Sequence, residues 1–297
     1  MIVDVHSHLM WYPEHLSEEY ASAALEAKLV KLRSSGGLVN DSALDLHTYD
    51  SRPEDHWRVF SEQVDRVVVF GLQARHAGIY VPNELVAEYA AAHPERVVGW
   101  ASVDPTEPDC VRQLEHAVLE LGLRGLKLGP VYQHFDPTDH AYFPLWAKCV
   151  ELGLPTIWHQ GTTFPRNAPL KWANPVQLEE IALAFPELVM IIAHLGHPWE
   201  AETIVTIRKQ PNMYADVSAI HYRPWRMWQA LVTAQEYGVE HKLLFGSDYP
   251  SGRPSDVIAG LRSVNDIVDG TRFPRVTDKT IDAIVNHNHV ALFPEWA

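Results

Sequence analysis

The chain has 297 residues, of which 46% are hydrophobic, so it can form one large α/β domain or two small ones with a substantial buried core. Its formal net charge of −14 repels phosphate backbones, and we therefore expect no nucleic-acid partner. The sequence has no apolar run long enough for a membrane span, no leader pattern and only two cysteines, so we expect a cytoplasmic protein with no membrane partner.

Strand-like and helical segments alternate along the chain. Apolar runs typical of strands cover residues 2–9, 65–71, 97–103, 123–129, 154–160, 188–194, 212–218 and 242–248. Helical spacing follows at 83–93, 107–121, 141–152, 175–185, 199–209, 224–237, 255–268 and 278–292. This alternation predicts an α/β fold with a parallel sheet closed into a (β/α)8 TIM barrel, in which the first and eighth strands are neighbours.

One connection is too long for an ordinary loop between a strand and a helix. Residues 10–53 follow the first strand, whereas such loops usually have about two to six residues. The segment contains a predicted helix at 18–33 and aromatic residues such as Trp11, Tyr20 and Tyr49. We predict a single barrel domain over residues 1–297, in which 10–53 forms a lid over the barrel mouth or a surface for a homodimer.

A His-x-His pair, His6 and His8, lies in the first strand. Side chains two residues apart on a strand point to the same side, so both imidazoles can bind one metal ion. Among 17 histidines such a pair also arises by chance, and two hydrogen-bonded histidines are the alternative. However, His159, His194 and Asp248 also end strand-like runs. Because the carboxyl ends of barrel strands carry the chemistry of this fold, we expect all five residues at one site.

These residue types predict a metal centre. A nitrogen-rich ligand set with one carboxylate suits Zn²⁺ best and also admits Mn²⁺, and we predict His6, His8, His159 and Asp248 as the ligands. A bound divalent ion lowers the pKa of its water and polarises a carbonyl group. We predict that His194 is a catalytic base and that Asp248 also accepts a proton from the water. For His194, the alternatives are a further ligand or a structural histidine.

Three residues are candidates for binding the substrate. Lys127 ends the fourth strand, where it can be a carbamylated bridge between two metal ions, a cation that contacts an anionic substrate, or a buried partner of a carboxylate. We favour the cationic or ion-paired roles. Tyr132 follows in the next loop, and Arg166 is one of several loop arginines that can either bind a carboxylate or form a surface salt bridge.

The motifs resemble those of the amidohydrolase superfamily. The similarity is to the amidohydrolase-related branch, which includes aminocarboxymuconate semialdehyde decarboxylase and pyrone-dicarboxylate lactonase. It rests on Asp4-Val-His-Ser-His8, Gly125-Leu-Lys-Leu128, Trp158-His-Gln-Gly161, Ala193-His-Leu-Gly-His-Pro198, Phe245-Gly-Ser-Asp-Tyr-Pro250 and the closing segment 286–293. The resemblance covers essentially the whole chain. It implies a barrel with a divalent metal bound by the four predicted ligands and with His194 as the neighbouring catalytic histidine.

The resemblance is less specific for the reaction. It implies either hydrolysis of amides, lactones and esters or non-oxidative decarboxylation of unsaturated or aromatic acids. We predict a metal-dependent hydrolase that uses a metal-activated water on a small carbonyl, lactone or amide substrate, with a metal-dependent decarboxylase as the alternative. Aromatic-acid decarboxylases of the branch often carry Glu where this chain has His6. This difference argues against a decarboxylase of the resorcylate type. A non-catalytic metal-binding barrel is a third alternative, against which the additional histidine argues.

Overall fold

The computed structural model describes residues 1–34 and 44–286. The predicted lid segment 10–53 is therefore described except for 35–43, and the predicted helical residues 287–292 and the motif residues 287–293 lie outside the described part. No described helix is both long and apolar enough to cross a membrane.

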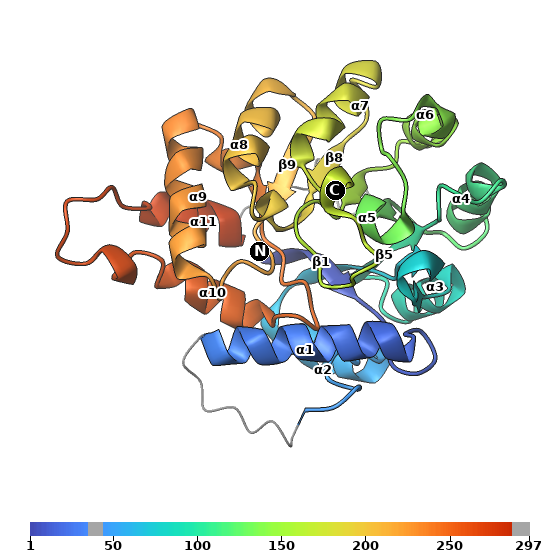
Figure 1. Ribbon diagram of the computed structural model, residues 1–297, viewed down its shortest axis with the longest axis horizontal. Coiled ribbons are helices and arrows are strands. Elements are labelled where there is room, and N and C mark those ends of the chain that lie inside the picture. Colours follow the sequence, from blue (N-terminus) through green and yellow to red (C-terminus); the bar gives the residue numbers. More distant parts are fainter. Residues whose placement is uncertain (35–43, 287–297) are drawn as a thin grey trace.

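Eight parallel strands form one sheet that curls into a barrel, as predicted from the alternation of strands and helices (Figure 1). In sheet order the strands are β1 (Val3–His8), β2 (Arg66–Phe70), β5 (Val97–Ser102), β6 (Leu126–Leu128), β7 (Thr156–Trp158), β8 (Met190–Ile192), β9 (Met213–Asp216) and β10 (Leu243–Leu244). The chain after β10 returns to β1, where the Val5 N–H donates to the Phe245 carbonyl (3.0 Å) and the His8 N–H donates to the Tyr249 carbonyl (2.9 Å). These bonds bring the first and last strands together.

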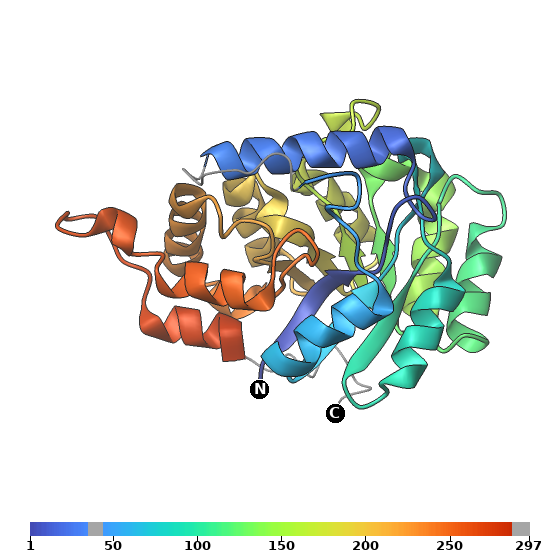
Figure 2. The ribbon, with the colours of Figure 1, turned by 90° about the horizontal axis from the view of Figure 1, so that it is seen from below.

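Helices surround the sheet on its outer side (Figures 1 and 2). They are α3 (Asn83–Ala92), α4 (Cys110–Leu119), α6 (Phe143–Glu151), α7 (Leu178–Ala184), α8 (Glu200–Lys209), α9 (Pro224–Tyr237), α10 (Pro254–Arg262) and α11 (Asp278–Asn286). A short helix, α5 (Pro130–Gln133), and a hairpin of β3 (Gln73–Ala74) and β4 (Ile79–Tyr80) were not expected.

The helix α2 (Pro53–Gln63) was also missed, although its sequence carries signals for a helix. Proline stands at its first turn and acidic residues follow, which suits a helix N-terminus. Its buried residues are His56, Val59 and Phe60, at positions i, i+3 and i+4. This is the spacing of one helix face, and that face packs against the barrel. This helix is the crossover between β1 and β2.

Two apolar clusters stabilise the barrel. The larger cluster lies between the sheet and the surrounding helices. The smaller cluster joins Phe70, Trp100, Ile157, Ile191 and Leu244, which come from β2, β5, β7, β8 and β10. Strands on opposite sides of a closed sheet make contact only through its interior, so these side chains fill the barrel below the carboxyl ends of the strands.

The helix α1 (Glu18–Ser34) lies across the carboxyl ends of the strands (Figure 2). It is anchored at its start, where the Ser17 N–H donates to the Gly78 carbonyl (2.8 Å) and the Tyr80 N–H donates to the His15 carbonyl (2.9 Å). A lid would occupy this position. The alternative role of this segment in a homodimer stays a prediction.

Candidate metal centre and active site

Three predicted ligands meet at the carboxyl end of the barrel. Nε2 of His6 lies 3.2 Å from Nε2 of His8 and 3.3 Å from Oδ1 of Asp248, and His8 Nε2 lies 3.4 Å from the same oxygen. Ligand atoms that each bind one ion at about 2.1 Å are separated by roughly 3.0–3.4 Å. The three side chains, called the metal cluster below, therefore fit a single divalent ion.

The backbone at Asp248 directs its carboxylate toward the histidines. Asp248 has a φ of 58°, in the left-handed region that Asp tolerates better than most residues, and its N–H donates to the His6 carbonyl (2.8 Å). Burial on its own would raise the pKa of the Asp248 carboxyl group. The neighbouring His194 and the hydrogen bonds from His6 and His8 nevertheless hold its pKa well below the ordinary value, so it is ionised at neutral pH.

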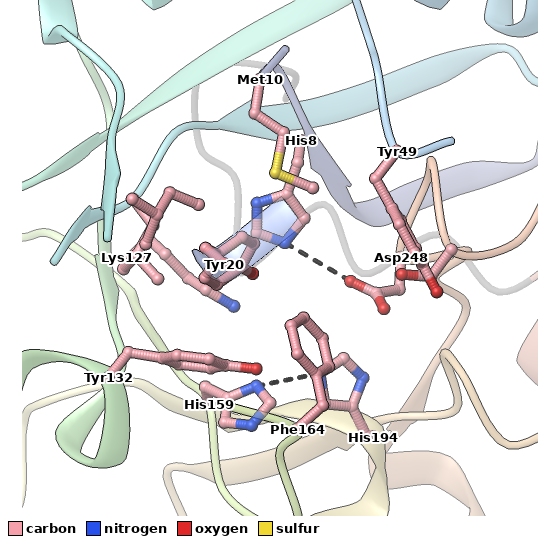
Figure 3. Close-up of a pocket in the computed structure, with 13 residues that line it drawn as sticks. His8, Met10, Tyr20, Tyr49, Lys127, Tyr132, His159, Phe164, His194 and Asp248 are labelled. Atoms are coloured by element: carbon pink, nitrogen blue, oxygen red, sulfur yellow. Dashed lines mark hydrogen bonds and ion pairs between the residues drawn. The ribbon is translucent and has the colours of Figure 1, made fainter. Parts of the chain in front are cut away.

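His159 and His194 form a pair beside the metal cluster. Nδ1 of His159 lies 3.2 Å from Nε2 of His194, and Figure 3 shows this pair across the cavity from His8 and Asp248. Burial lowers the pKa of His194 to about 4 and lowers that of His159 well below its ordinary value. Both rings are thus neutral at pH 7 and can accept a proton. The role of His159 as a metal ligand stays a prediction.

Two residues at the end of β9 were missed by the sequence analysis. Oδ2 of Asp216 accepts a hydrogen bond from Nδ1 of His6 (2.8 Å), which leaves the Nε2 lone pair of His6 for the metal cluster. Ser218 Oγ lies 2.7 Å from Nδ1 of His194. Asp216 is the last residue of β9, but the predicted apolar run 212–218 continued to Ser218, so Asp216 was not singled out. His6, His194 and Asp216 are also close enough for one ion, but the His6–Asp216 distance is that of a hydrogen bond.

Lys127 brings a cation to the metal cluster. Its Nζ lies 3.3 Å from Nε2 of His6 and 4.7 Å from the centre of the Phe70 ring, and the side chain is almost fully buried. Burial lowers the pKa of Lys127 to about 8, against the opposite effect of Asp248 and Asp216. The amine therefore remains mostly protonated at pH 7 and lines the same cavity as His8 and Asp248 (Figure 3).

The cavity at the barrel mouth has an inner and an outer part. The inner part, about 70 Å³, adjoins the metal cluster, and the outer part, about 390 Å³, extends under α1. The residues that line both parts are Tyr49, Tyr132, His159, Phe164, His194, Asp248 and Ser251. Tyr132 thus lies where it was predicted. Arg166 is exposed and is not among the described residues that line either part.

Comparisons with known proteins identify a sequence relative and proteins of similar fold. The curated 2-amino-3-carboxymuconate-6-semialdehyde decarboxylase of Dictyostelium discoideum is 23% identical over 198 residues, 57% of this chain, and the chain spans only 55% of that protein. Two solved structures share the fold. They are a 5-carboxyvanillate decarboxylase from Novosphingobium aromaticivorans complexed with manganese (TM-score 0.67, 13% identity, covering 99% of this chain and 96% of that chain) and a probable 2-pyrone-4,6-dicarboxylic acid hydrolase from Acinetobacter baumannii (TM-score 0.62, 16% identity, covering 99% of both chains).

The family assignment rests on the sequence itself. The amidohydrolase family model matches residues 3–293, a range that includes every strand of the barrel and every residue of the metal cluster. The chain therefore belongs to the amidohydrolase family, which confirms the resemblance seen in its motifs.

Proposed function

We propose that this protein is a metal-dependent decarboxylase that acts on an unsaturated or aromatic carboxylic acid. The observation that carries this proposal is the buried cation of Lys127 beside the metal cluster, because the two together suit a carboxylate at the reacting end of the substrate. The curated relative is a decarboxylase, and several solved structures with this fold are decarboxylases. These findings support the alternative of the sequence analysis better than its first choice, hydrolysis.

A divalent ion fits the three ligands and would supply a Lewis acid that stabilises negative charge on the oxygens of the substrate. The sequence favours Zn²⁺, whereas the structural relatives complexed with manganese favour Mn²⁺, and we propose a divalent ion from this pair. His159, which lies beside the cluster, is proposed as the additional ligand or as the partner that orients His194.

The side chains around the metal cluster have separate roles in the proposed decarboxylation. Decarboxylation breaks the bond between the carboxylate and its carbon, releases carbon dioxide and requires a proton at that carbon. The ammonium group of Lys127 holds the carboxylate. In an acid that carries a hydroxyl group beside the carboxylate, the neutral ring of His194 takes the hydroxyl proton and returns it to the carbon, and the product leaves as its oxyanion. The side chains of Tyr132 and Phe164 cover the cavity, where they favour a planar substrate and exclude water.

Product analysis tests this proposal. Protein loaded with Zn²⁺ or Mn²⁺ is incubated with aromatic and unsaturated acids, lactones and amides in water enriched in ¹⁸O. We expect carbon dioxide from an acid and no ¹⁸O in the organic product. Opening of a lactone or amide with ¹⁸O in the new carboxylate, and no carbon dioxide, would instead establish hydrolysis.

Variants of the site distinguish its parts. Asp248→Asn should lose both metal and turnover, because it removes the charged ligand. His194→Asn should keep most of the metal and lose the rate, since His194 is assigned to proton transfer. Loss of metal from the His194→Asn variant would identify His194 as a primary ligand.

Hydrolysis remains the second candidate because of one observation. The neutral His159–His194 pair lies beside the metal cluster, where it can accept a proton from an attacking water, and Asp248 can do the same. One of the solved structures with this fold is named as a probable hydrolase of a cyclic dicarboxylic acid. The isotope experiment separates this reaction from decarboxylation.

A further inference from the structure

The outer part of the cavity carries two cations that the proposed chemistry does not use. Lys31 comes from the last turn of α1, and Arg223 directly precedes α9. Both side chains are half-buried, and both line the outer cavity together with His159, His194 and Asp248 of the active site. A ligand that extends from the metal cluster into this space can therefore reach cations at the outer cavity.

Both cations contact the same aromatic ring. Nζ of Lys31 lies 3.5 Å from the centre of the Tyr222 ring, and Cζ of Arg223 lies 4.4 Å from the same centre. Each cation is also positioned by the backbone, since Lys31 Nζ donates to the Ser251 carbonyl (3.0 Å) and Arg223 Nη1 donates to the Ala219 carbonyl (3.2 Å). Both cations therefore lie next to Tyr222, a residue that also lines the outer cavity.

The charge of this region is opposite to that of the whole protein. The chain carries 38 acidic and 24 basic side chains, yet Asp248 is the only acid among the described residues that line the outer cavity. Burial, followed by the neighbouring Lys28, lowers the pKa of Lys31 to about 7. An anion bound between Lys31 and Arg223 would offset the repulsion between these cations and the cost of burying them.

We propose that Lys31 and Arg223 form a subsite for a second acidic group of the substrate, so that the preferred substrate is a dicarboxylic acid. The first carboxylate lies at the metal cluster and Lys127, and the second lies in the outer cavity. The location of the first carboxylate rests on the proposed function. The subsite itself assigns a substrate-binding role to the helix α1, which lies across the mouth of the barrel.

Binding of matched acids to the metal-loaded protein tests the subsite without any need for turnover. The probes are benzene-1,3-dicarboxylate, benzene-1,4-dicarboxylate and naphthalene-2,6-dicarboxylate, each compared by calorimetry with the monoacid of the same ring. Their carboxylates are separated by different distances, which covers the length of the cavity. In wild-type protein we expect at least one diacid to bind about tenfold or more tightly than its monoacid, the gain of one charge-assisted hydrogen bond.

Variants identify the residues that cause the preference. Lys31→Met and Arg223→Gln should each reduce the diacid preference by about tenfold, and Lys31→Arg should retain most of it. Lys28→Met is the matched control, because Lys28 lies one turn earlier on the same helix and is not among the described lining residues of the cavity. It should keep or increase the preference, because both cations of the subsite remain and loss of Lys28 removes a charge that lowers the pKa of Lys31.

Two outcomes would overturn the subsite. One is a wild-type protein that binds no diacid more tightly than its monoacid. The other is a diacid preference that persists in both the Lys31→Met and Arg223→Gln variants. Because the readout is binding, it differs from the test of the proposed function: absence of carbon dioxide release together with a Lys31-dependent preference would refute decarboxylation and keep the subsite.

Discussion

Replacing Asp216 with asparagine tests how a second carboxylate controls the metal cluster. Oδ1 of Asp216 accepts hydrogen bonds from the N–H groups of His194 (3.0 Å) and Ser218 (2.9 Å) and from the Ser218 hydroxyl group. The amide oxygen of asparagine would take this position, and its NH₂ group would then face Nδ1 of His6. His6 would have to accept at Nδ1 and carry its proton on Nε2, where it cannot bind a metal ion.

The expected effect follows from this change of tautomer. Loss of the group that orients a metal-binding histidine typically lowers metal affinity by about 10- to 100-fold, or roughly 1.4–2.8 kcal/mol. We expect a decrease of this size in Asp216→Asn, measured by competition with a chromophoric chelator for Zn²⁺ and for Mn²⁺. Ser218→Ala keeps the His6–Asp216 hydrogen bond and should change the affinity much less. Equal metal affinity in Asp216→Asn and wild-type protein, both folded by circular dichroism, would refute the role assigned to Asp216.

Three further changes have definite expected outcomes. His8→Ala should leave far less than one metal ion per chain by elemental analysis, with the barrel still folded by circular dichroism, because the imidazole lies at the strand end above the apolar core. Gly161→Ala should lower the free energy of unfolding in urea by about 1–3 kcal/mol, since Gly161 has a φ of 114° and a Cβ there would overlap the His197 carbonyl. A urea midpoint of unfolding equal to that of the wild-type protein would contradict the conformation described at Gly161. The affinity for a diacid that binds the outer cavity should fall as pH rises through about 7, where Lys31 loses its proton, and calorimetry should show no such fall in Lys31→Arg, whose guanidinium stays charged. Among the described residues, the groups around Lys31 include Lys28, His221, Tyr222, Arg223, Asp248 and Asp256.

The fold could be predicted from the sequence because its signals are local. Each barrel strand is an apolar run, and the segments between the runs have helical spacing, so the order of elements follows directly. The His-x-His motif also needs only the two-residue period of a strand. Asp216 could have been found by similar reasoning, since it lies near the end of the seventh predicted run, 212–218, and is the last residue of β9.

The geometry of the site could not be predicted in this way. The pairing of His159 with His194 depends on the backbone at His194, which has a φ of 58° and is held by a hydrogen bond from its N–H to Asp216. No sequence pattern specifies this conformation for a histidine. Similarly, Lys31 and Arg223 come from distant parts of the chain and meet only because α1 crosses the barrel mouth. Arg166 was predicted to bind substrate only because it is an arginine in a loop. The structure places it at the exposed surface, and this position is not readable from the sequence.

Charge balance connects the metal centre with the proposed substrate. Burial raises the pKa values of Asp248 and Asp216, but the neighbouring histidines outweigh this effect and keep both pKa values low. The two carboxylates are therefore ionised and would neutralise the charge of a divalent ion. The buried ammonium of Lys127 then leaves the inner cavity with a positive charge that one carboxylate can balance. In the outer cavity, Lys31 and Arg223 add further positive charge. A diacid would place negative charge in both parts of the cavity, whereas a monoacid would reach only one of them, and this difference is the physical basis for the expected preference.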